Sequence, residues 1–373
     1  MLDTSRGFGG GYWSPNGATL YPNLSNAEAA SSPISPSATG FGTTASGLGT
    51  GDFIYLTIRR PNKPPTTGTQ VYNAIARTGT GAAATVTGVG FAPDVVGGWS
   101  IGGAPDAFTD RLRGRDNVLL SAFAYAETPM GASNGVNSFL MDGISLNADA
   151  GYGYYNSNGL TYINHFFRRA PGFMDVVCDT GTGAAHAIAH NLTKAPELII
   201  RKSRSAATQW EVWHSALAAT EKLVLNSNAA KATDATAWGS TLPTATQFTV
   251  GTGANVNANA ATFVTYLFST LTGISKVGSY SGNGGTQTIP CGFTTGSRFI
   301  LIKRVDNTGD WFVWDTTRGI TPTTDPHLSL NTTVAEVTTD DSINQDASGF
   351  VVNQNAATNI NALGGNYLFL AIA

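Results

Sequence analysis

The segment ATFVTYLFSTL (261–271) appears four times in this chain, each time in a variant form. The other copies read GDFIYLTIRRP (51–61), LTYINHFFRRAP (160–171) and GNYLFLAIA (365–373). β-Branched and aromatic residues dominate these copies, and Gly, Asn and Ser surround them, which predicts β-strands. Successive copies begin about a hundred residues apart, which is the size of a small domain and far longer than a solenoid repeat. The spacing therefore predicts an array of related β-domains.

Other landmarks keep the same order between the copies of this strand. Each later unit opens with a glycine hairpin signal and continues with a short apolar run. Two units then carry a tryptophan pair, in QWEVWH (209–214) and DWFVWD (310–315). The landmarks divide the chain into four predicted units, which are an incomplete unit at 1–60, a divergent one at 61–171, and two close copies at 172–272 and 273–373.

The composition favours compact all-β modules. Only 12% of the residues are charged, against roughly 25% in typical globular proteins. Glycine accounts for 44 of the 373 residues, and strong helix formers are scarce. We therefore expect a tandem array of antiparallel β-sandwich domains of jelly-roll type, related by a repeat of about 100 residues. Domains in series make a rod or a plate with many lateral contact surfaces.

Charge and hydropathy exclude several partners. The formal net charge of −3 provides no basic surface for nucleic acid. No apolar run approaches the ~20 residues of a membrane helix, so we expect no membrane insertion. The first thirty residues lack the layout of a signal peptide, so we expect synthesis in a cytoplasm without classical export. Cys178 and Cys291 occupy different places in their units, which favours two buried free thiols over a disulfide.

Two short motifs are typical of catalytic or metal sites, but their surroundings do not support such a role. GWSIG (98–102) matches the G-x-S-x-G nucleophile elbow, which requires a strand-turn-helix corner in an α/β sheet. His186 and His190 share one face of a predicted strand, yet zinc needs at least a third ligand. We therefore expect a protein that is not an enzyme and has no catalytic residue, metal site or cofactor.

Tryptophan and asparagine supply the candidate contact residues. The pairs Trp210–Trp213 and Trp311–Trp314 allow two interpretations, because an indole face can stack on a sugar ring or pack in the core. Residues three apart on a strand face opposite sides, so one member of each pair is expected in the core. Asn255 and Asn257 either contact a glycan or form a turn, since Asn tolerates left-handed backbone and makes Asx-turns. These six residues are the candidate ligand or interface contacts.

Seven motifs follow one another in the last unit. They are YSGNG (280–284), ILIK (300–303), WFVWD (311–315), TTRG (316–319), LSLN (328–331), GFVV (349–352) and YLFLAI (367–372). Their order resembles a family of repeated β-domains in virion proteins of tailed bacteriophages. The resemblance spans nearly the whole chain and is weakest over 85–150. It implies a structural component of a phage tail fibre, tail tip or baseplate that faces the host receptor and is assembled into virions in the host cytoplasm.

The resemblance also implies partners. They are other virion or tail proteins and further copies of the same chain, with a homotrimer favoured by analogy with phage fibres. Two alternatives stay open: a capsid decoration (cement) protein, and an adhesin built of glycan-binding modules that bind a host-surface glycan. Residues 1–60 hold only the second half of a unit, and an incomplete sheet leaves strand edges and an apolar face uncovered. We therefore expect residues 1–60 to complete their sheet with a neighbouring domain or chain.

Overall fold

The computed structural model of this chain describes residues 63–149 and 151–373. On the N-terminal side it also describes Ser25 and two short antiparallel strand pairs. These pairs are β1 (Ala18–Thr19) with β2 (Ala29–Ala30), and β3 (Ile34–Pro36) with β4 (Phe41–Thr43). The prediction that residues 1–60 complete a sheet with a neighbour rests on residues outside the described part.

Three large sheets, named here sheets 1, 2 and 3, dominate the described part. Sheet 1 has the strand order β5-β13-β7-β8-β9-β10, sheet 2 the order β14-β21-β16-β17-β18-β19, and sheet 3 the order β22-β29-β24-β25-β26. Every pairing in them is antiparallel. The predicted all-β, antiparallel fold class is therefore confirmed.

The strands of these sheets have the following bounds. Sheet 1 contains β5 (Tyr72–Thr78), β7 (Val95–Ser100), β8 (Ala107–Asp110), β9 (Asn117–Leu120), β10 (Thr128–Pro129) and β13 (Thr161–Phe167). Sheet 2 contains β14 (Met174–Thr180), β16 (Leu198–Ser203), β17 (Glu211–His214), β18 (Glu221–Val224), β19 (Ala232–Thr233) and β21 (Thr262–Phe268). Sheet 3 contains β22 (Ser275–Ser281), β24 (Phe299–Arg304), β25 (Trp311–Asp315), β26 (His327–Ser329) and β29 (Asn366–Ile372).

The repeated segment of the sequence forms the second strand of each large sheet. Strands β13, β21 and β29 each lie between an edge strand and a third strand that runs antiparallel to them. Both faces of these strands are buried: Tyr367 and Phe369 of β29 belong to one core, and Leu368 and Leu370 to another. Burial on both faces explains why these strands read as almost continuous apolar runs.

A small sheet lies against the outer face of each large one. Next to sheet 1 it has the order β11-β12-β6, with β6 (Ala84–Val86), β11 (Val136–Leu140) and β12 (Gly143–Leu146). Next to sheet 2 it pairs β15 (His186–Ala189) with β20 (Gln247–Val250), and next to sheet 3 it joins β23 (Thr286–Pro290), β28 (Gly349–Asn353) and β27 (Ile343–Asp346). Side chains of the small and large sheets share cores, as Phe350 and Phe369 do at 5.3 Å. Each pair of sheets is therefore a β-sandwich.

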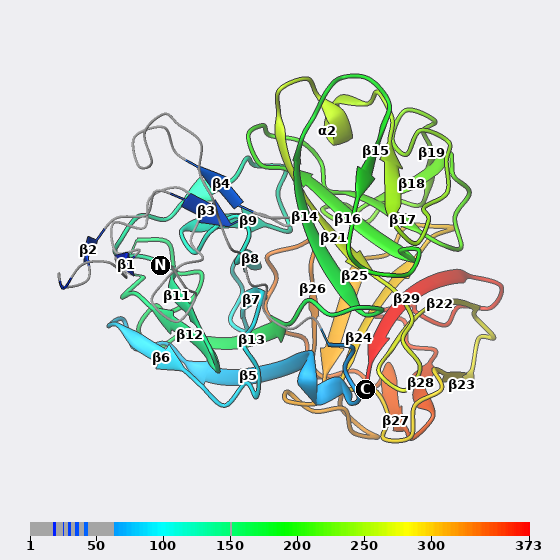
Figure 1. The fold of residues 1–373 in the computed structure, drawn as a ribbon. Helices are drawn as coiled ribbons and strands as arrows, with labels where there is room; N and C mark the ends of the chain where they lie inside the picture. The colour runs from blue at the N-terminus through cyan, green and yellow to red at the C-terminus, as the bar shows by residue number, and fades with distance from the viewer. Residues whose placement is uncertain are drawn as a thin grey trace.

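The inner faces of the three large sheets meet in one shared core. Phe167 of sheet 1 lies 6.2 Å from Phe268 of sheet 2 and 5.8 Å from Phe299 of sheet 3, measured between ring centroids. Tyr72 of sheet 1 also lies 5.3 Å from Phe299. In Figure 1, sheet 1 runs from sky blue to green, sheet 2 from green to yellow-green, and sheet 3 from yellow through orange to red, and the three sheets are arranged around this centre. The three sheets therefore close around one core instead of forming a rod.

Helical structure is minor in the described residues. It consists of a single 3-10 turn, η2 (Gly68–Gln70), and one helical turn, α2 (Ala254–Asn257). Within this part of the chain, no helix is long and apolar enough to cross a membrane.

Candidate functional site: the seams between the three sheets

Three seams join the large sheets, and one equivalent backbone hydrogen bond crosses each of them. In seam A, between sheets 1 and 2, Glu127 N–H donates to the Arg204 carbonyl at 2.7 Å. In seam B, between sheets 2 and 3, Lys231 N–H donates to Val305 at 2.9 Å, and in seam C, between sheets 3 and 1, Glu336 N–H donates to Ile101 at 3.0 Å. Each acceptor directly follows the third strand of its sheet, which is β7, β16 or β24. The seams therefore form a closed ring of three equivalent steps, 1 to 2, 2 to 3 and 3 to 1.

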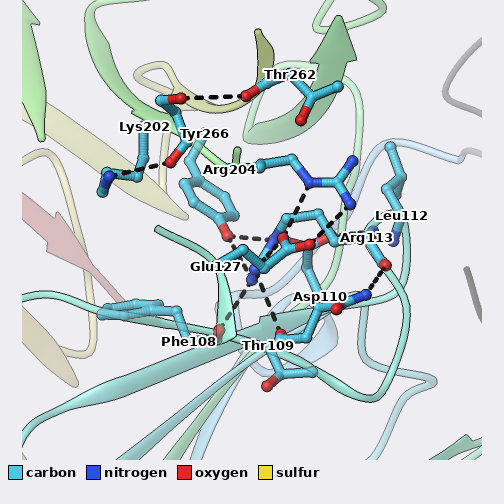
Figure 2. A network of polar contacts seen from close by, with 12 residues as sticks. Phe108, Thr109, Asp110, Leu112, Arg113, Glu127, Lys202, Arg204, Thr262 and Tyr266 are labelled. Atoms are coloured by element: carbon cyan, nitrogen blue, oxygen red, sulfur yellow. Dashed lines mark hydrogen bonds and ion pairs between the residues drawn. The ribbon is translucent and has the colours of Figure 1, made fainter. Parts of the chain in front are cut away.

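A buried polar network closes seam A (Figure 2). Asp110 ends β8, and its carboxylate accepts hydrogen bonds from the Arg113 guanidinium and from the Tyr266 hydroxyl of sheet 2, the latter at 2.8 Å. Arg113 also donates to Glu127 at 3.0 Å, and Glu127 accepts two bonds of 2.9 Å from Arg204 of sheet 2. Burial alone would raise the pKa of Asp110, but Arg113 and the Tyr266 hydroxyl lower it below its usual value. The network thus holds charged groups in a dry contact between two sheets.

The same arrangement closes seam C with residues about two hundred positions later. Asp315 ends β25 and pairs with Arg318, which also donates to Glu336 at 3.1 Å. The partner from sheet 1 is His165, whose Nε2 lies 3.5 Å from the Asp315 carboxylate and whose Nδ1 shares a 2.9 Å hydrogen bond with the Tyr72 hydroxyl. Burial lowers the pKa of His165 to about 3, although Asp315 acts in the opposite direction. His165 is therefore neutral at physiological pH.

The spacing of Asp and Arg in both seams has a local cause. The Asp110 carboxylate also accepts the backbone N–H groups of Leu112 and Arg113, at 3.0 and 2.8 Å. The Asp315 carboxylate accepts those of Thr317 and Arg318, both at 3.0 Å. This Asx-type turn places the arginine three residues later beside the same carboxylate. The sequence motif of this turn is D-R-L-R-G at 110–114 and D-T-T-R-G at 315–319. Only the second of these is among the motifs named from the sequence above.

Seam B has neither charged residue. His214 and Leu217 stand where the other seams have aspartate and arginine, and both are buried. His214 Nδ1 accepts the backbone N–H of Ala216 at 3.0 Å. Burial lowers the pKa of His214 to about 4, and contacts with the backbone of Phe369 and Gly278 in sheet 3 only partly oppose this. Seam B is therefore closed by a neutral imidazole and an apolar side chain.

An open cleft of about 680 Å³ lies in seam B. Its lining includes Glu197, His214, Ala216, Lys276, Ser279 and Gln287. In seam C the matching space is filled: Arg298 donates to the Tyr72 carbonyl at 3.0 Å, and the Thr317 hydroxyl donates to the Ala74 carbonyl at 3.2 Å. Glu197 and Ala216 occupy these two positions in seam B, and Glu197 instead accepts a bond from the backbone of Thr270. The cleft is thus open because the side chains of Glu197 and Ala216 do not bond to the edge strand β22, as Arg298 and Thr317 bond to β5 in seam C.

The four candidate tryptophans are buried, with exposed fractions of 1% for Trp210, 4% for Trp213, 2% for Trp311 and 0% for Trp314. Two of them cross seams: Trp210 Nε1 donates to the Leu120 carbonyl of sheet 1 at 3.0 Å, and Trp311 Nε1 donates to the Val224 carbonyl of sheet 2 at 2.9 Å. None of the four offers a face for stacking on a surface ligand in this structure. In seam C, Asp106 occupies the position equivalent to Trp210 and Trp311. Burial raises the pKa of Asp106, and the positive charge of Arg318 only partly opposes this.

The two candidate asparagines have structural contacts. Asn257 is buried; its Oδ1 accepts the Thr182 N–H at 2.8 Å, and its Nδ2 donates to the Ala184 and Gly251 carbonyls, each at 2.7 Å. Asn156 and Asn361 make the same kind of contacts in the other two units. Asn255 donates to Glu211 at 2.8 Å. Asn257 therefore ties the glycine hairpin of its unit to the turn before the central strand.

The remaining motifs make no common site. Ser100 is buried in β7. His186 contacts Thr182 and Ala184, whereas His190 contacts the Thr244 carbonyl. Within the described residues, no group of three or more His, Cys, Asp or Glu side chains is placed to hold a metal ion. Cys178 and Cys291 are free thiols, as predicted; Cys291 is buried, whereas Cys178 is half-buried rather than buried.

The fold and its seams define a single-chain ring of three β-sandwiches. The chain belongs to the family described as a domain of unknown function, DUF7483, whose model matches residues 67–373. No curated protein matches the chain. A solved structure described as "Crystal Structure of the STIV MCP" matches with 9% identity and a TM-score of 0.18, over 54% of this chain and 92% of that one. That similarity is too low to support an inference.

Proposed function

We propose that this protein is a structural component of a bacteriophage particle and belongs to its tail fibre, tail tip or baseplate. The observation that carries the proposal is that the resembling motifs have structural roles in the ring. The D-T-T-R-G motif closes seam C through Asp315 and Arg318. The L-S-L-N motif ends in Asn331, whose side-chain oxygen accepts a hydrogen bond from the backbone N–H of Trp311 at 2.8 Å. The closing strand β29 is buried on both faces.

The polar networks themselves argue for a scaffold. The buried carboxylates Asp110 and Asp315 are each paired with an arginine and with backbone N–H groups, so their charge is already neutralised inside the protein. A catalytic carboxylate needs access to substrate as well as a shifted pKa. We therefore propose a non-enzymatic role, with other virion proteins and further copies of this chain as partners, in a homotrimer by analogy with phage fibres.

Localisation on the particle tests the proposal. Particles purified from the virus or prophage that encodes this sequence are analysed by mass spectrometry and electron cryo-microscopy. We expect the chain in the purified particles, with density for the ring at the tail. Density on the capsid surface would instead support a decoration protein, and absence from the particles would overturn the virion role.

The oligomeric state is measured separately by light scattering on the purified chain of 38.8 kDa. A mass of three chains supports the trimer. A monomer at all concentrations would overturn the trimer but not the location on the particle.

A further inference from the structure

Sheet 1 carries an aromatic cluster at the surface that sheets 2 and 3 lack. Phe123 and Tyr125 stack with ring centroids 4.8 Å apart and planes 9° apart, and Tyr152 and Tyr154 stack at 5.7 Å and 29°. Tyr125 is 57% exposed and Tyr152 44%. The two pairs lie over the same part of the molecule, because Phe123 and Tyr154 both pack against the hydrophobic core beneath the outer face of sheet 1. In agreement, burial and then the groups Tyr152, Asp149 and Tyr125 raise the pKa of Tyr154. These four residues, Phe123, Tyr125, Tyr152 and Tyr154, are called the aromatic platform below.

The hydroxyl groups of the platform are unlike those of the other described tyrosines. In residues 63–149 and 151–373, the hydroxyls of six tyrosines make hydrogen bonds within the protein: Tyr72, Tyr155, Tyr162, Tyr266, Tyr280 and Tyr367. The hydroxyls of Tyr125, Tyr152 and Tyr154 have no such bond to the described residues. With respect to the described residues, the platform thus combines exposed ring faces with hydroxyls that have no protein partner, which suits a ligand with both apolar and polar surfaces.

The ring of sheets does not require these aromatic residues. The seam hydrogen bonds of Glu127, Lys231 and Glu336 fix the register of the three loops. In that register, Ser227 and Ala229 of sheet 2, or Thr332 and Val334 of sheet 3, replace Phe123 and Tyr125. The turns before Asn257 and Asn361 read GTGANV (251–256) and AATNI (356–360), with no aromatic residue. The same backbone therefore forms without the platform.

Both loops of the platform are anchored from below. The carbonyl of Gly153, between the two tyrosines, accepts the Tyr162 hydroxyl at 2.8 Å. The Asp149 carboxylate accepts the backbone N–H groups of Tyr155 and Asn156, the latter at 2.9 Å. On the other loop, the Ala124 carbonyl accepts a bond from the Lys202 ammonium at 3.4 Å. A surface whose backbone is already fixed loses little entropy when a ligand binds.

We propose that the aromatic platform binds a neutral carbohydrate, with sugar rings stacked on the exposed faces of Tyr125 and Tyr152. The exposed parts of these two side chains amount to roughly 200 Å², since an aromatic side chain has about 150–250 Å². A stable protein interface needs about 800 Å² per partner, so the platform is too small for one and fits one or two sugar rings. Charge does not favour an ionic ligand, because the nearby Glu127 and Asp149 are already bonded to Arg204 and to backbone N–H groups.

The inference is independent of the virion role and is tested on the purified full-length chain. The probe is an array of neutral oligosaccharides of glucose, galactose, mannose and their N-acetylated forms, with titration of any hit followed by calorimetry. We expect binding of at least one neutral glycan and a loss of affinity of tenfold or more in the double variant Tyr125→Ala/Tyr152→Ala. The variant Val334→Ala is the matched control, because Val334 is 65% exposed at the position equivalent to Tyr125; it should bind as the wild type does.

Three results would overturn the inference. These are the absence of any neutral glycan hit, unchanged affinity in the double variant, and a change of oligomeric mass in that variant, which would make the platform a protein interface. Both residues are exposed, so we expect an unfolding temperature close to that of the wild type, and light scattering on the same samples reports the mass. Tyr125→Phe keeps the ring and removes the hydroxyl, so a smaller loss there than in Tyr125→Ala supports stacking.

Discussion

Seam A and seam B join neighbouring sheets through the same backbone hydrogen bond, but their side chains differ. Seam A buries Asp110, Arg113 and Tyr266 in one network, whereas seam B has His214 and Leu217 at the first two positions. Seam B also leaves a cleft of about 680 Å³ beside the edge strand β22. The backbone hydrogen bond and the apolar core are thus common to both seams, and the charged pair is one of two ways to fill the space between the sheets. Replacing a buried ion pair by well-packed uncharged side chains of similar volume is often neutral for stability or stabilising.

The largest expected effect comes from breaking the charged pair of seam A. Arg113→Met removes the cation and leaves the buried carboxylate of Asp110 without its main partner. We expect a loss of about 3–5 kcal/mol in the free energy of unfolding, as for other buried pairs that lose one member. Urea unfolding at pH 7, followed by tryptophan fluorescence, measures the change.

Leu217→Met in seam B is the matched control, since it gives the same side chain at the equivalent position. It conserves an apolar residue of similar volume, so its loss should stay below about 1.5 kcal/mol. Equal losses for the two variants would show that the buried charge of seam A does not distinguish it from seam B.

A smaller effect is expected from a contact that all three units share. Asn257→Ala leaves the Thr182 N–H and two carbonyls without their partner, which should cost about 2–3 kcal/mol. Asn156→Ala and Asn361→Ala should cost at least as much, because these residues make equivalent backbone contacts and also accept a side-chain hydrogen bond, from Arg77 and from Gln287 respectively. Urea unfolding measures the free energy of unfolding of all three variants. Similar losses in the three would show that this contact stabilises every unit, although the side chains of the seams differ.

Asn255→Ala is the control for that comparison. Asn255 makes a hydrogen bond to Glu211, so a loss of about 1 kcal/mol is expected. A loss for Asn255→Ala as large as that for Asn257→Ala would contradict the assignment of Asn257 as the residue that fixes the hairpin.

Much of the fold could be predicted from the sequence, and the seams could not. The strand repeat at 161–167, 262–268 and 366–372 indicated the antiparallel sheets, because β-branched and aromatic runs between turn residues are a local signal. The shared core depends on which faces of separate sheets meet, and no local pattern encodes that. The tryptophans illustrate the consequence: residues three apart lie on opposite faces of a strand, so the sequence predicts one of each pair in the core and leaves open whether the other is buried or contacts a ligand. Each large sheet is covered on both faces, so Trp210 and Trp213 are both buried.

Histidine protonation gives a third test of the seams. His165 in seam C and His214 in seam B have pKa values of about 3 and about 4, because burial opposes their charge. An unfolded histidine has a pKa of about 6.5, so the unfolded state binds more protons between these values. The stability contributed by each neutral histidine is therefore complete above pH 6.5 and is lost as the pH falls toward the folded-state pKa, which is about 3 for His165 and about 4 for His214.

The variant His214→Gln should thus lose less stability than the wild type between pH 7 and pH 4.5. Comparison with the wild type is essential, because Asp325, whose pKa burial raises to about 7, acts in the opposite direction in this range. The difference between the two proteins in urea midpoint, measured at half-unit pH steps, isolates His214. A constant difference across the range would mean that His214 does not titrate on unfolding.

The smallest expected effect comes from making seam B more like seam C. Ala216→Thr introduces the hydroxyl that Thr317 uses in seam C to bond the carbonyl of the facing edge strand. Val277 is the matching residue of β22, and its carbonyl already accepts a bond from Thr270 at 3.3 Å, which leaves one lone pair free. One added hydrogen bond at a partly open cleft should raise the free energy of unfolding by about 0.5–1 kcal/mol.

Ala216→Val, with the same shape and no hydroxyl, is the control. If both variants stabilise equally, then filling the cleft matters and the hydrogen bond does not. If neither does, the cleft is not a defect in packing, and its open state would have to be explained by a ligand or by a neighbouring molecule.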